Sequence, residues 1–203
     1  MSQQRPCTAA GVAYPTVGGL AGQRFRRVLH ISMVIVPLVY YYLLCSLTTP
    51  VRPLLVLAVF YVQLLVLIVE GVRLTSGALF FGQRAHERNQ LSSFAAGSIG
   101  LFQVLLFAPS PIIGVAIIAS CAFADPYAGW LRTHTQCIGR SILGTWLLVT
   151  LIWLICHWYG GLPWYLCACL PAIIVMAEHV EQHYIDDNLL MMILPLLLGN
   201  YLQ

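Results

Sequence analysis

The sequence contains no lysine and little charge of any kind. Charged residues make up 8% of its 203 residues, whereas hydrophobic residues make up 60%. A typical soluble domain has about 25% charged residues. The composition therefore excludes an ordinary soluble domain and predicts an integral membrane protein surrounded by membrane lipids. The net charge of +3 comes from arginine alone, and so small an excess argues against a nucleic-acid partner.

Several common site signatures are also missing. The sequence has no Gly-x-x-x-x-Gly-Lys-Ser/Thr loop and no Gly-x-Gly-x-x-Gly turn, which excludes the P-loop and Rossmann nucleotide sites. The seven cysteines are scattered, and the Cys167/Cys169 pair has no complementary second pair, so we expect buried free thiols. The first 23 residues have no apolar run, so no secretory signal peptide is predicted.

Apolar runs of near-membrane length recur along the whole chain. They predict an all-α, polytopic transmembrane helix bundle of about seven spans. The bundle forms one domain, residues 23–203, after a disordered polar tail, residues 1–22. The predicted spans are residues 31–47, 54–72, 91–108, 111–124, 142–160, 162–180 and 189–203. The fourth and seventh are shorter than the roughly twenty residues a span needs, which leaves tilting, longer true bounds or a re-entrant fourth segment open.

The charges are predicted to lie on one side of the membrane. Arginines cluster at the start of the first span, and the positive-inside rule then places the N-terminus in the cytoplasm. With seven spans, every acid falls on that side: Glu70, Glu87, Asp125, Glu178, Glu181, Asp186 and Asp187. Acids contribute little to orientation. Either the outer loops are too short to carry charge, or several helix ends build a cytoplasmic polar site.

The densest charge lies in "EHVEQHYIDDN", residues 178–188. His179 and His183 are spaced to share a helix face, but Glu181 is displaced from its position in the zinc-protease motif H-E-x-x-H. A di-iron site would need more histidines than the isolated ones elsewhere. Mg²⁺-nucleotide chemistry needs carboxylates and arginines together, and both fall on the predicted inner face.

Six motifs follow one another in a characteristic order along most of the chain. They are "RRVLH" (26–30), "EGVR" (70–73), "HERNQLSS" (86–93), "FADPYAG" (123–129), "RSILGT" (140–145) and "AEHVEQHYIDDNLLMMILP" (177–195). In this order they resemble the motifs of the CTP-dependent lipid-alcohol kinases, namely dolichol kinase, phytol kinase and the CTP-using diacylglycerol kinase. These membrane enzymes are related to the phosphatidate cytidylyltransferases. Two departures are Ala124, where the family has Gly, and Leu143, where it usually has Glu.

The resemblance implies a multi-pass enzyme that transfers the γ-phosphate of CTP to the hydroxyl of a lipid alcohol, with Mg²⁺, at the cytoplasmic face. The acceptor would be a polyprenol or dolichol, phytol or diacylglycerol. The residues that it implies are, for the metal, Asp125 and Asp187; for catalysis, Glu178, Asp186 and Asp187; for the nucleotide, Arg27, Arg73, Arg140, Asn188 and His30; and for a further polar site, Glu70 and Glu87.

Simpler interpretations of the same residues remain open. Asp125 precedes Pro126, a pair typical of a helix N-terminus, where the aspartate is the N-cap. Asp186 and Asp187 precede an apolar run, and an N-cap of the helix predicted there explains them equally well. Glu70 and Arg73, at i and i+3, are spaced for a plain ion pair. Two other functions also stay open: a CDP-lipid-forming cytidylyltransferase, whose closing signature is absent, and a non-catalytic family member or lipid transporter.

Overall fold

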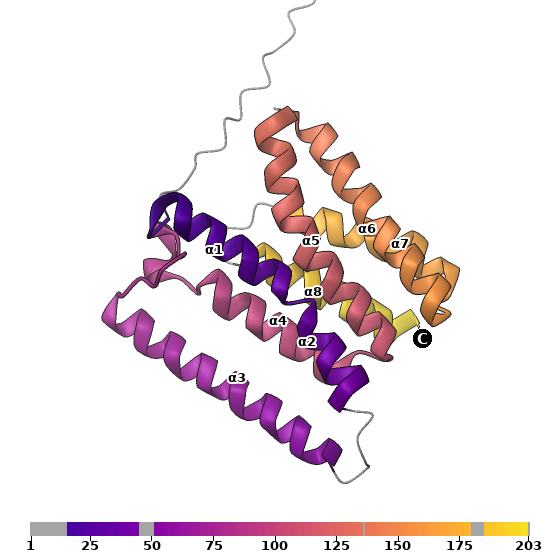
Figure 1. The fold of residues 1–203 in the computed structure, drawn as a ribbon, viewed down its shortest axis with the longest axis horizontal. Helices are drawn as coiled ribbons and strands as arrows, with labels where there is room; N and C mark the ends of the chain where they lie inside the picture. Colours follow the sequence, from indigo (N-terminus) through magenta and orange to yellow (C-terminus); the bar gives the residue numbers. More distant parts are fainter. Residues whose placement is uncertain (1–15, 45–50, 136, 180–184, 203) are drawn as a thin grey trace, which may run out of the picture.

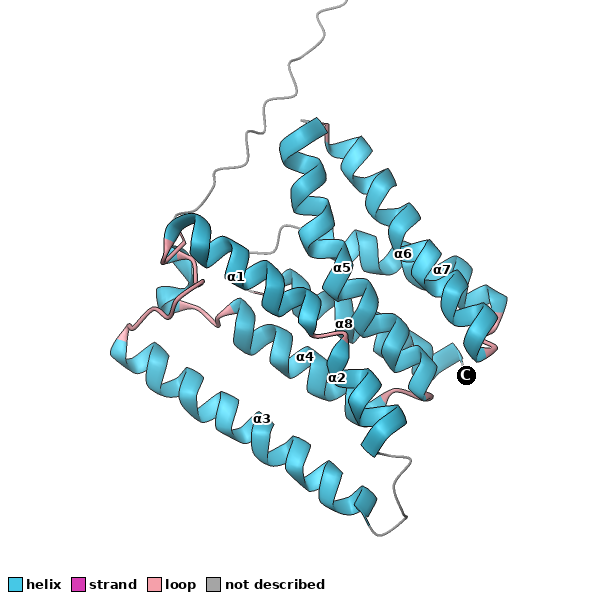
Figure 2. Ribbon diagram, viewed as in Figure 1, coloured by secondary structure: helices cyan, strands magenta, loops and turns pink. Residues whose placement is uncertain are grey.

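The protein is all-helical in the part described by the computed structural model, residues 16–44, 51–135, 137–179 and 185–202 (Figures 1 and 2). Within these residues the extended pairing is limited to an isolated bridge between Thr16 and Arg84. This confirms the all-α class predicted from the sequence. Residues 16–22 belong to this bridge and to the first turns of a helix, so the folded part begins before the expected boundary at residue 23.

The first apolar segment is not one continuous span. It is divided among α1 (Gly19–Ser32), α2 (Ile35–Leu38) and a π-helical turn, η1 (Val39–Leu44). Helix α1 begins in a polar stretch that a search for apolar runs passes over. Gly18 makes the turn into α1 with φ 86°, and a Cβ at this position would clash with the ring of Phe81.

Among the described residues, three helices are long and apolar enough to cross a membrane. They are α3 (Val51–Ser76), α5 (Pro111–Thr135) and α6 (Ile138–Gly160). The apolar helices α4 (Ser93–Phe107), α7 (Trp164–His179) and α8 (Asp187–Leu202) have 15 or 16 residues. At about 1.5 Å per residue they are shorter than a hydrocarbon core of about 30 Å. A membrane protein is supported, and the number of spans stays a prediction.

Helix α5 is the central element of the fold. About half of its residues are buried, and it packs against α6, α7, α8, α4 and α1. Small side chains such as Ala116 and Ser120 let neighbouring helices approach closely. The buried indole of Trp153 on α6 donates to Ser120 Oγ at 3.0 Å, which fixes α6 against α5. Helix α3 lies at the edge, beside α4 (Figure 1).

The fourth predicted span ends at residue 124 and the fifth begins at residue 142, but both helices extend further, which is the alternative of longer true bounds left open by the sequence. Helix α5 continues through Asp125 and Pro126 to Thr135, and α6 begins at Ile138. Asp125 therefore lies inside a helix, and its interpretation as an N-cap is wrong. Proline has no N–H to donate, so Pro126 leaves the backbone of α5 without one helical hydrogen bond beside Asp125. The site described below is built around this turn.

Candidate metal centre

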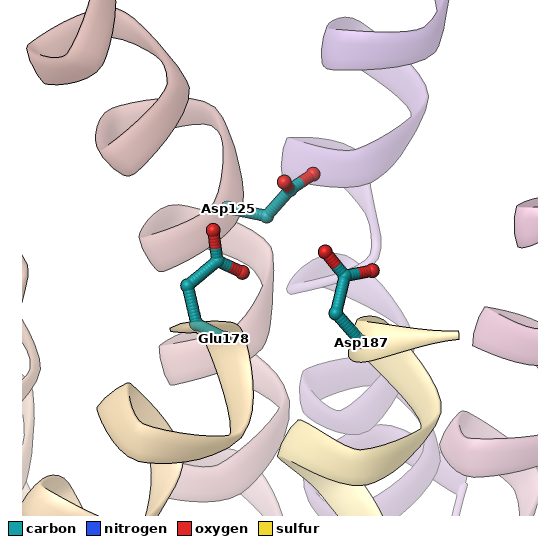
Figure 3. A group of neighbouring side chains, drawn as sticks. All are labelled: Asp125, Glu178 and Asp187. Atoms are coloured by element: carbon teal, nitrogen blue, oxygen red, sulfur yellow. The ribbon is translucent and has the colours of Figure 1, made fainter. Parts of the chain in front are cut away.

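Three carboxylates from three helices meet beside the middle of the bundle. Asp125 comes from α5, Glu178 from the last turn of α7 and Asp187 from the first residue of α8. One oxygen of each lies within 4.8 Å of the others. Figure 3 shows the three side chains pointing toward a common point. Asp125 precedes Glu178 by 53 residues in the sequence. The fold brings them together through the packing of α7 and α8 on α5.

Glu178 is the most deeply placed of the three. Its side chain is fully buried, and Oε1 accepts a hydrogen bond from Arg132 Nη2 at 2.8 Å. Oε2 is buried too, but it has no hydrogen-bond partner in the described part of the chain. A buried carboxylate oxygen without a partner is costly, because burial removes its water. Glu178 thus combines an orphaned oxygen with two neighbouring carboxylates, which is the arrangement that a cation would stabilise.

Burial and the neighbouring negative charges shift the pKa of Asp187. Burial, and then the negative charges of Asp125 and Asp186, raise the pKa of Asp187 to about 7. Arg84 and the N–H of Asn188 act in the opposite direction. All the donor atoms of the cluster are carboxylate oxygens, the ligands preferred by hard divalent cations such as Mg²⁺. The residues present therefore fit the Mg²⁺ ion that the sequence predicts.

Asp186 has a structural role that the sequence left open. Its Oδ1 accepts from the N–H of Asn188 at 3.0 Å, and Asp187 Oδ1 accepts from the same group at 2.9 Å. Asp186 thus caps α8, as an Ncap aspartate does. Asn188 itself is buried, and the thiol of Cys121 on α5 approaches its Oδ1 at 3.8 Å. These contacts hold the start of α8 against α5.

His30 of α1 lies beside the Asp125 end of the carboxylate cluster. Its Nε2 lies 3.1 Å from the carbonyl oxygen of Cys121, so Nε2 carries the proton and donates. The same nitrogen lies 3.8 Å from Asp125 Oδ2. His30 is thereby held at the turn of α5 that contains Asp125. His30, which the sequence assigns to the nucleotide, thus lies beside Asp125, and its role toward a ligand stays a prediction.

Glu70 and Arg73 form a separate, closed cluster. Arg73 Nε and Nη2 donate to the two oxygens of Glu70 at 2.9 and 2.8 Å, and further donors reach the backbone oxygens of Glu87 and Gln90. Glu70 also accepts from the N–H and hydroxyl of Ser92. The ion pair expected from the i, i+3 spacing is thus present. It joins the end of α3 to the start of α4, and Arg73 is fully engaged there, away from solvent.

Glu87 forms a second buried ion pair. It lies in the 3-10 turn η2 (Ala85–Asn89), and its Oε1 accepts from Arg26 of α1 at 2.9 Å. Ser93 also donates to Oε1, at 3.3 Å, whereas Oε2 has no hydrogen-bond partner among the described residues. The pair connects α1 to the start of α4.

Three residues singled out by the sequence motifs, two predicted nucleotide ligands and one departure from the family motif, lie on the surface. Arg27, Arg140 and Leu143 are exposed, and none has a described contact with the carboxylates. Conversely, Arg132 contacts Glu178 and the charge of Arg84 acts on Asp187, and neither arginine is among the site residues predicted from the sequence. Arg132 follows Asp125 by seven residues, two helical turns, so their shared face is evident once the helix is known to continue.

Of the two histidines considered as zinc ligands, His183 lies outside the described residues, and so does Glu181. His179 is described: its Nδ1 lies 2.9 Å from the carbonyl oxygen of Val175, and its Nε2 is buried without a hydrogen-bond partner in the described part. The described carboxylate cluster contains no histidine.

A cavity of about 400 Å³ adjoins the carboxylate cluster. It lies between α1–α2, α4 and the start of α8, and it shares His30 and Asn188 with the surroundings of the cluster. Its volume falls within the roughly 300–1,000 Å³ typical of small-molecule sites. The carboxylates therefore stand next to a space large enough for a substrate.

Fold and site together define an all-helical protein with helices of membrane length and a buried three-carboxylate candidate metal centre. Comparison of this chain with family models, with curated proteins and with solved structures finds no match.

Proposed function

We propose that the protein is a membrane-embedded kinase that transfers the γ-phosphate of CTP to the hydroxyl of a lipid alcohol at the cytoplasmic face. The observation that supports it best is the meeting of Asp125 with Asp187. They belong to two distant motifs of the resemblance set out above, and they lie within one oxygen-only cluster with Glu178. CTP as the donor rests on that resemblance alone, as do the multi-pass topology and the cytoplasmic N-terminus.

In this proposal Asp125, Glu178 and Asp187 hold the Mg²⁺ ion, which neutralises phosphate charge when bound. Arg132 contacts Glu178, the charge of Arg84 acts on Asp187, and both face the phosphates with guanidinium groups. Exposed Arg27 and Arg140 remain available to the outer part of the nucleotide.

The chemical step needs one further acceptor. The alcohol oxygen forms a bond to the γ-phosphorus, the bond from that phosphorus to the bridging oxygen breaks, and CDP leaves. The hydroxyl proton passes to Asp186, the carboxylate at this site that is not assigned to the metal. His30 and Asn188 position the alcohol next to Asp125. Such a transfer depends mainly on positioning and charge neutralisation.

The test is phosphotransfer by the purified protein in lipid nanodiscs. It is given Mg²⁺, a panel of prenols, phytol and diacylglycerol, and CTP, ATP or GTP labelled at the γ-phosphate. We expect label in one class of lipid, with CTP alone. Asp125→Asn and Asp187→Asn should each lower the rate at least about 100-fold. Glu70→Gln removes a buried carboxylate outside the cluster and should leave the rate per folded molecule within about threefold.

Other products would overturn the proposal. A CDP-lipid with release of pyrophosphate identifies a cytidylyltransferase. No label in any lipid, from protein shown to be folded, favours a non-catalytic or transport role, and Leu143→Glu is then the first reversion to assay. Equal activity of both Asp→Asn variants and the wild type would refute the metal assignment.

A further inference from the structure

The cavity beside the carboxylates is polar at one end and apolar at the other. Its polar lining is Arg26 and Ser93 at one end, followed by His30 and Asn188 next to the cluster. Ser32 and Ser98 also line it, but their hydroxyls donate to the carbonyl oxygens of Leu29 and Phe94 in their own helices. Its apolar lining includes Met33, Val36 and Leu101. Met33 directly follows α1, Val36 lies in α2, and Leu101 lies about two turns after Ser93 in α4. The polarity of the lining therefore changes along the helices.

The helices on the two sides of the cavity, α1–α2 and α4, run in the same direction. The lining therefore becomes less polar toward the same end on both sides. At one end Arg26 and Ser93 both contact Glu87. At the other end Tyr41, which follows α2, donates to the carbonyl oxygens of Val104 and Leu105 in α4. Figure 1 shows α1 and α4 side by side. From Ser93 to Leu101 the cavity wall extends about 12 Å along α4, enough for a chain of several carbon atoms.

The cavity also reaches the apolar outside of the protein. Leu29 and Val36 line it, and they are 40% and 37% exposed. The opening thus lies between α1–α2 and α4, on a surface where neighbouring side chains such as Ile35 are apolar and exposed. A water-soluble ligand would not be expected to enter through such a surface, whereas a lipid would. The occupant that fits is an amphiphile with a small polar head and an apolar chain.

We propose that this cavity is the acceptor site. The first carbon atoms of a lipid alcohol lie between α1–α2 and α4, and its hydroxyl lies at His30 and Asn188, next to Asp125. The inference deepens the proposed function and rests on it for the identity of the reaction. Gly97 of α4 sets how thick a chain the cavity accepts.

The position of Gly97 makes this testable. Gly97 lines the cavity, and a Cβ there would meet no atom within 4 Å, whereas at Gly100, one turn later, it would lie 3.2 Å from Met192. A side chain at Gly97 therefore begins in open space at the wall of the cavity. Gly71 on α3 is exposed, and a Cβ there also meets nothing within 4 Å. Gly71→Leu is thus a matched control for Gly97→Leu, and both replace a helical glycine by a better helix former.

The experiment uses a long-chain prenol analogue that carries a photoreactive diazirine near its hydroxyl. The full chain is reconstituted in nanodiscs, irradiated and mapped by mass spectrometry. We expect labelling of residues 29–36 and 94–101, competed by the unmodified alcohol but not by its methyl ether. Gly97→Leu should lower this labelling at least fivefold and Gly71→Leu should not. In the kinase assay Gly97→Leu should raise KM for the alcohol about tenfold and leave KM for CTP unchanged.

The outcomes separate this inference from the proposed function. Phosphotransfer with labelling confined to α3, and with an unchanged alcohol KM in Gly97→Leu, overturns the cavity assignment while the kinase stands. Competed labelling of the cavity that is lost in Gly97→Leu, without phosphotransfer to any alcohol, supports the lipid-alcohol site and overturns the kinase. Labelling that the methyl ether competes equally well overturns the placement of the hydroxyl.

Discussion

Replacing Glu178 by glutamine tests whether the carboxylate cluster holds a cation. The variant keeps the shape of the side chain and an oxygen that accepts from Arg132, but it removes one of the three negative charges of the cluster. If the cluster is built for a cation, the charge destabilises the metal-free protein and stabilises the metal-bound protein. The substitution should therefore have opposite effects in the two conditions.

The magnitudes follow from the geometry. Two ionised carboxylates with oxygens within 4.8 Å repel by about 3 kcal/mol at an effective dielectric constant of about 20. Removing the charge of Glu178 relieves this repulsion, but it also weakens the contact of Glu178 with Arg132, which offsets part of the gain in stability. We expect Glu178→Gln to raise the metal-free stability by about 1 kcal/mol, or a Tm increase of roughly 2–4 °C. Saturating Mg²⁺, at about 100 times Kd, stabilises the wild type by about 2.7 kcal/mol, which corresponds to roughly 5–10 °C.

The assay is thermal unfolding in detergent at pH 8, followed by tryptophan fluorescence, in EDTA and in Mg²⁺. The variant should lose at least two thirds of the Mg²⁺-dependent rise in Tm. Glu70→Gln is the control: it weakens the buried pair with Arg73 and should lower Tm in both conditions, with the full Mg²⁺ shift retained. The reasoning is refuted if Glu178→Gln lowers the metal-free Tm as Glu70→Gln does and keeps the wild-type Mg²⁺ shift.

Two further predictions concern the fold and its topology. Gly18→Ala should lower Tm by roughly 4–8 °C, about 2 kcal/mol, because φ is 86° and the new methyl group meets Phe81. Gly19→Ala, with φ 56° and open space around the new methyl group, should lower Tm by less than half as much. Equal losses of Tm would contradict the predicted clash. Arg140 and Tyr159 are exposed near opposite ends of membrane-length α6, so in a cysteine-free background Arg140→Cys should react with an impermeant maleimide from the cytoplasmic side and Tyr159→Cys from the other. Reaction of both from one side would show that α6 does not span.

Much of the fold was predictable because apolar runs mark helices. Each predicted span coincides with a helix, apart from the first, which is divided. The end of α5 was mispredicted for a local reason. An Asp-Pro pair usually starts a helix, and charge after an apolar run usually ends one. Here tertiary packing outweighs both signals, since α5 is central and is covered by neighbours on several sides.

The same error concealed part of the site. With residues 125–141 read as a loop, Arg132 has no defined direction, and its two-turn spacing from Asp125 carries no meaning. Arg73 shows the opposite limit. Its spacing from Glu70 correctly indicates an ion pair, but no local pattern reveals that the backbone of Glu87 and Gln90 occupies its remaining donors. Which arginine is available to a ligand is decided by distant segments, so it cannot be read from a single motif.

Hydrogen-bond satisfaction distinguishes the buried acids better than their positions in the sequence do. Glu70 and Glu178 both lie near the end of an apolar helix, and both face an arginine. Glu70 accepts four hydrogen bonds, two from Arg73 and two from Ser92, so its charge is fully used in holding α3 to α4. Glu178 accepts from Arg132 with one oxygen, while the other oxygen is buried without a hydrogen-bond partner in the described part. A bundle that needed Glu178 only for packing would be better served by an apolar side chain there. Glu87 also has an unpartnered buried oxygen, but Glu178 combines one with two further carboxylates, Asp125 and Asp187, whose oxygens lie within 4.8 Å. This combination is the physical reason to assign the cluster to a ligand and the Glu70 cluster to the fold.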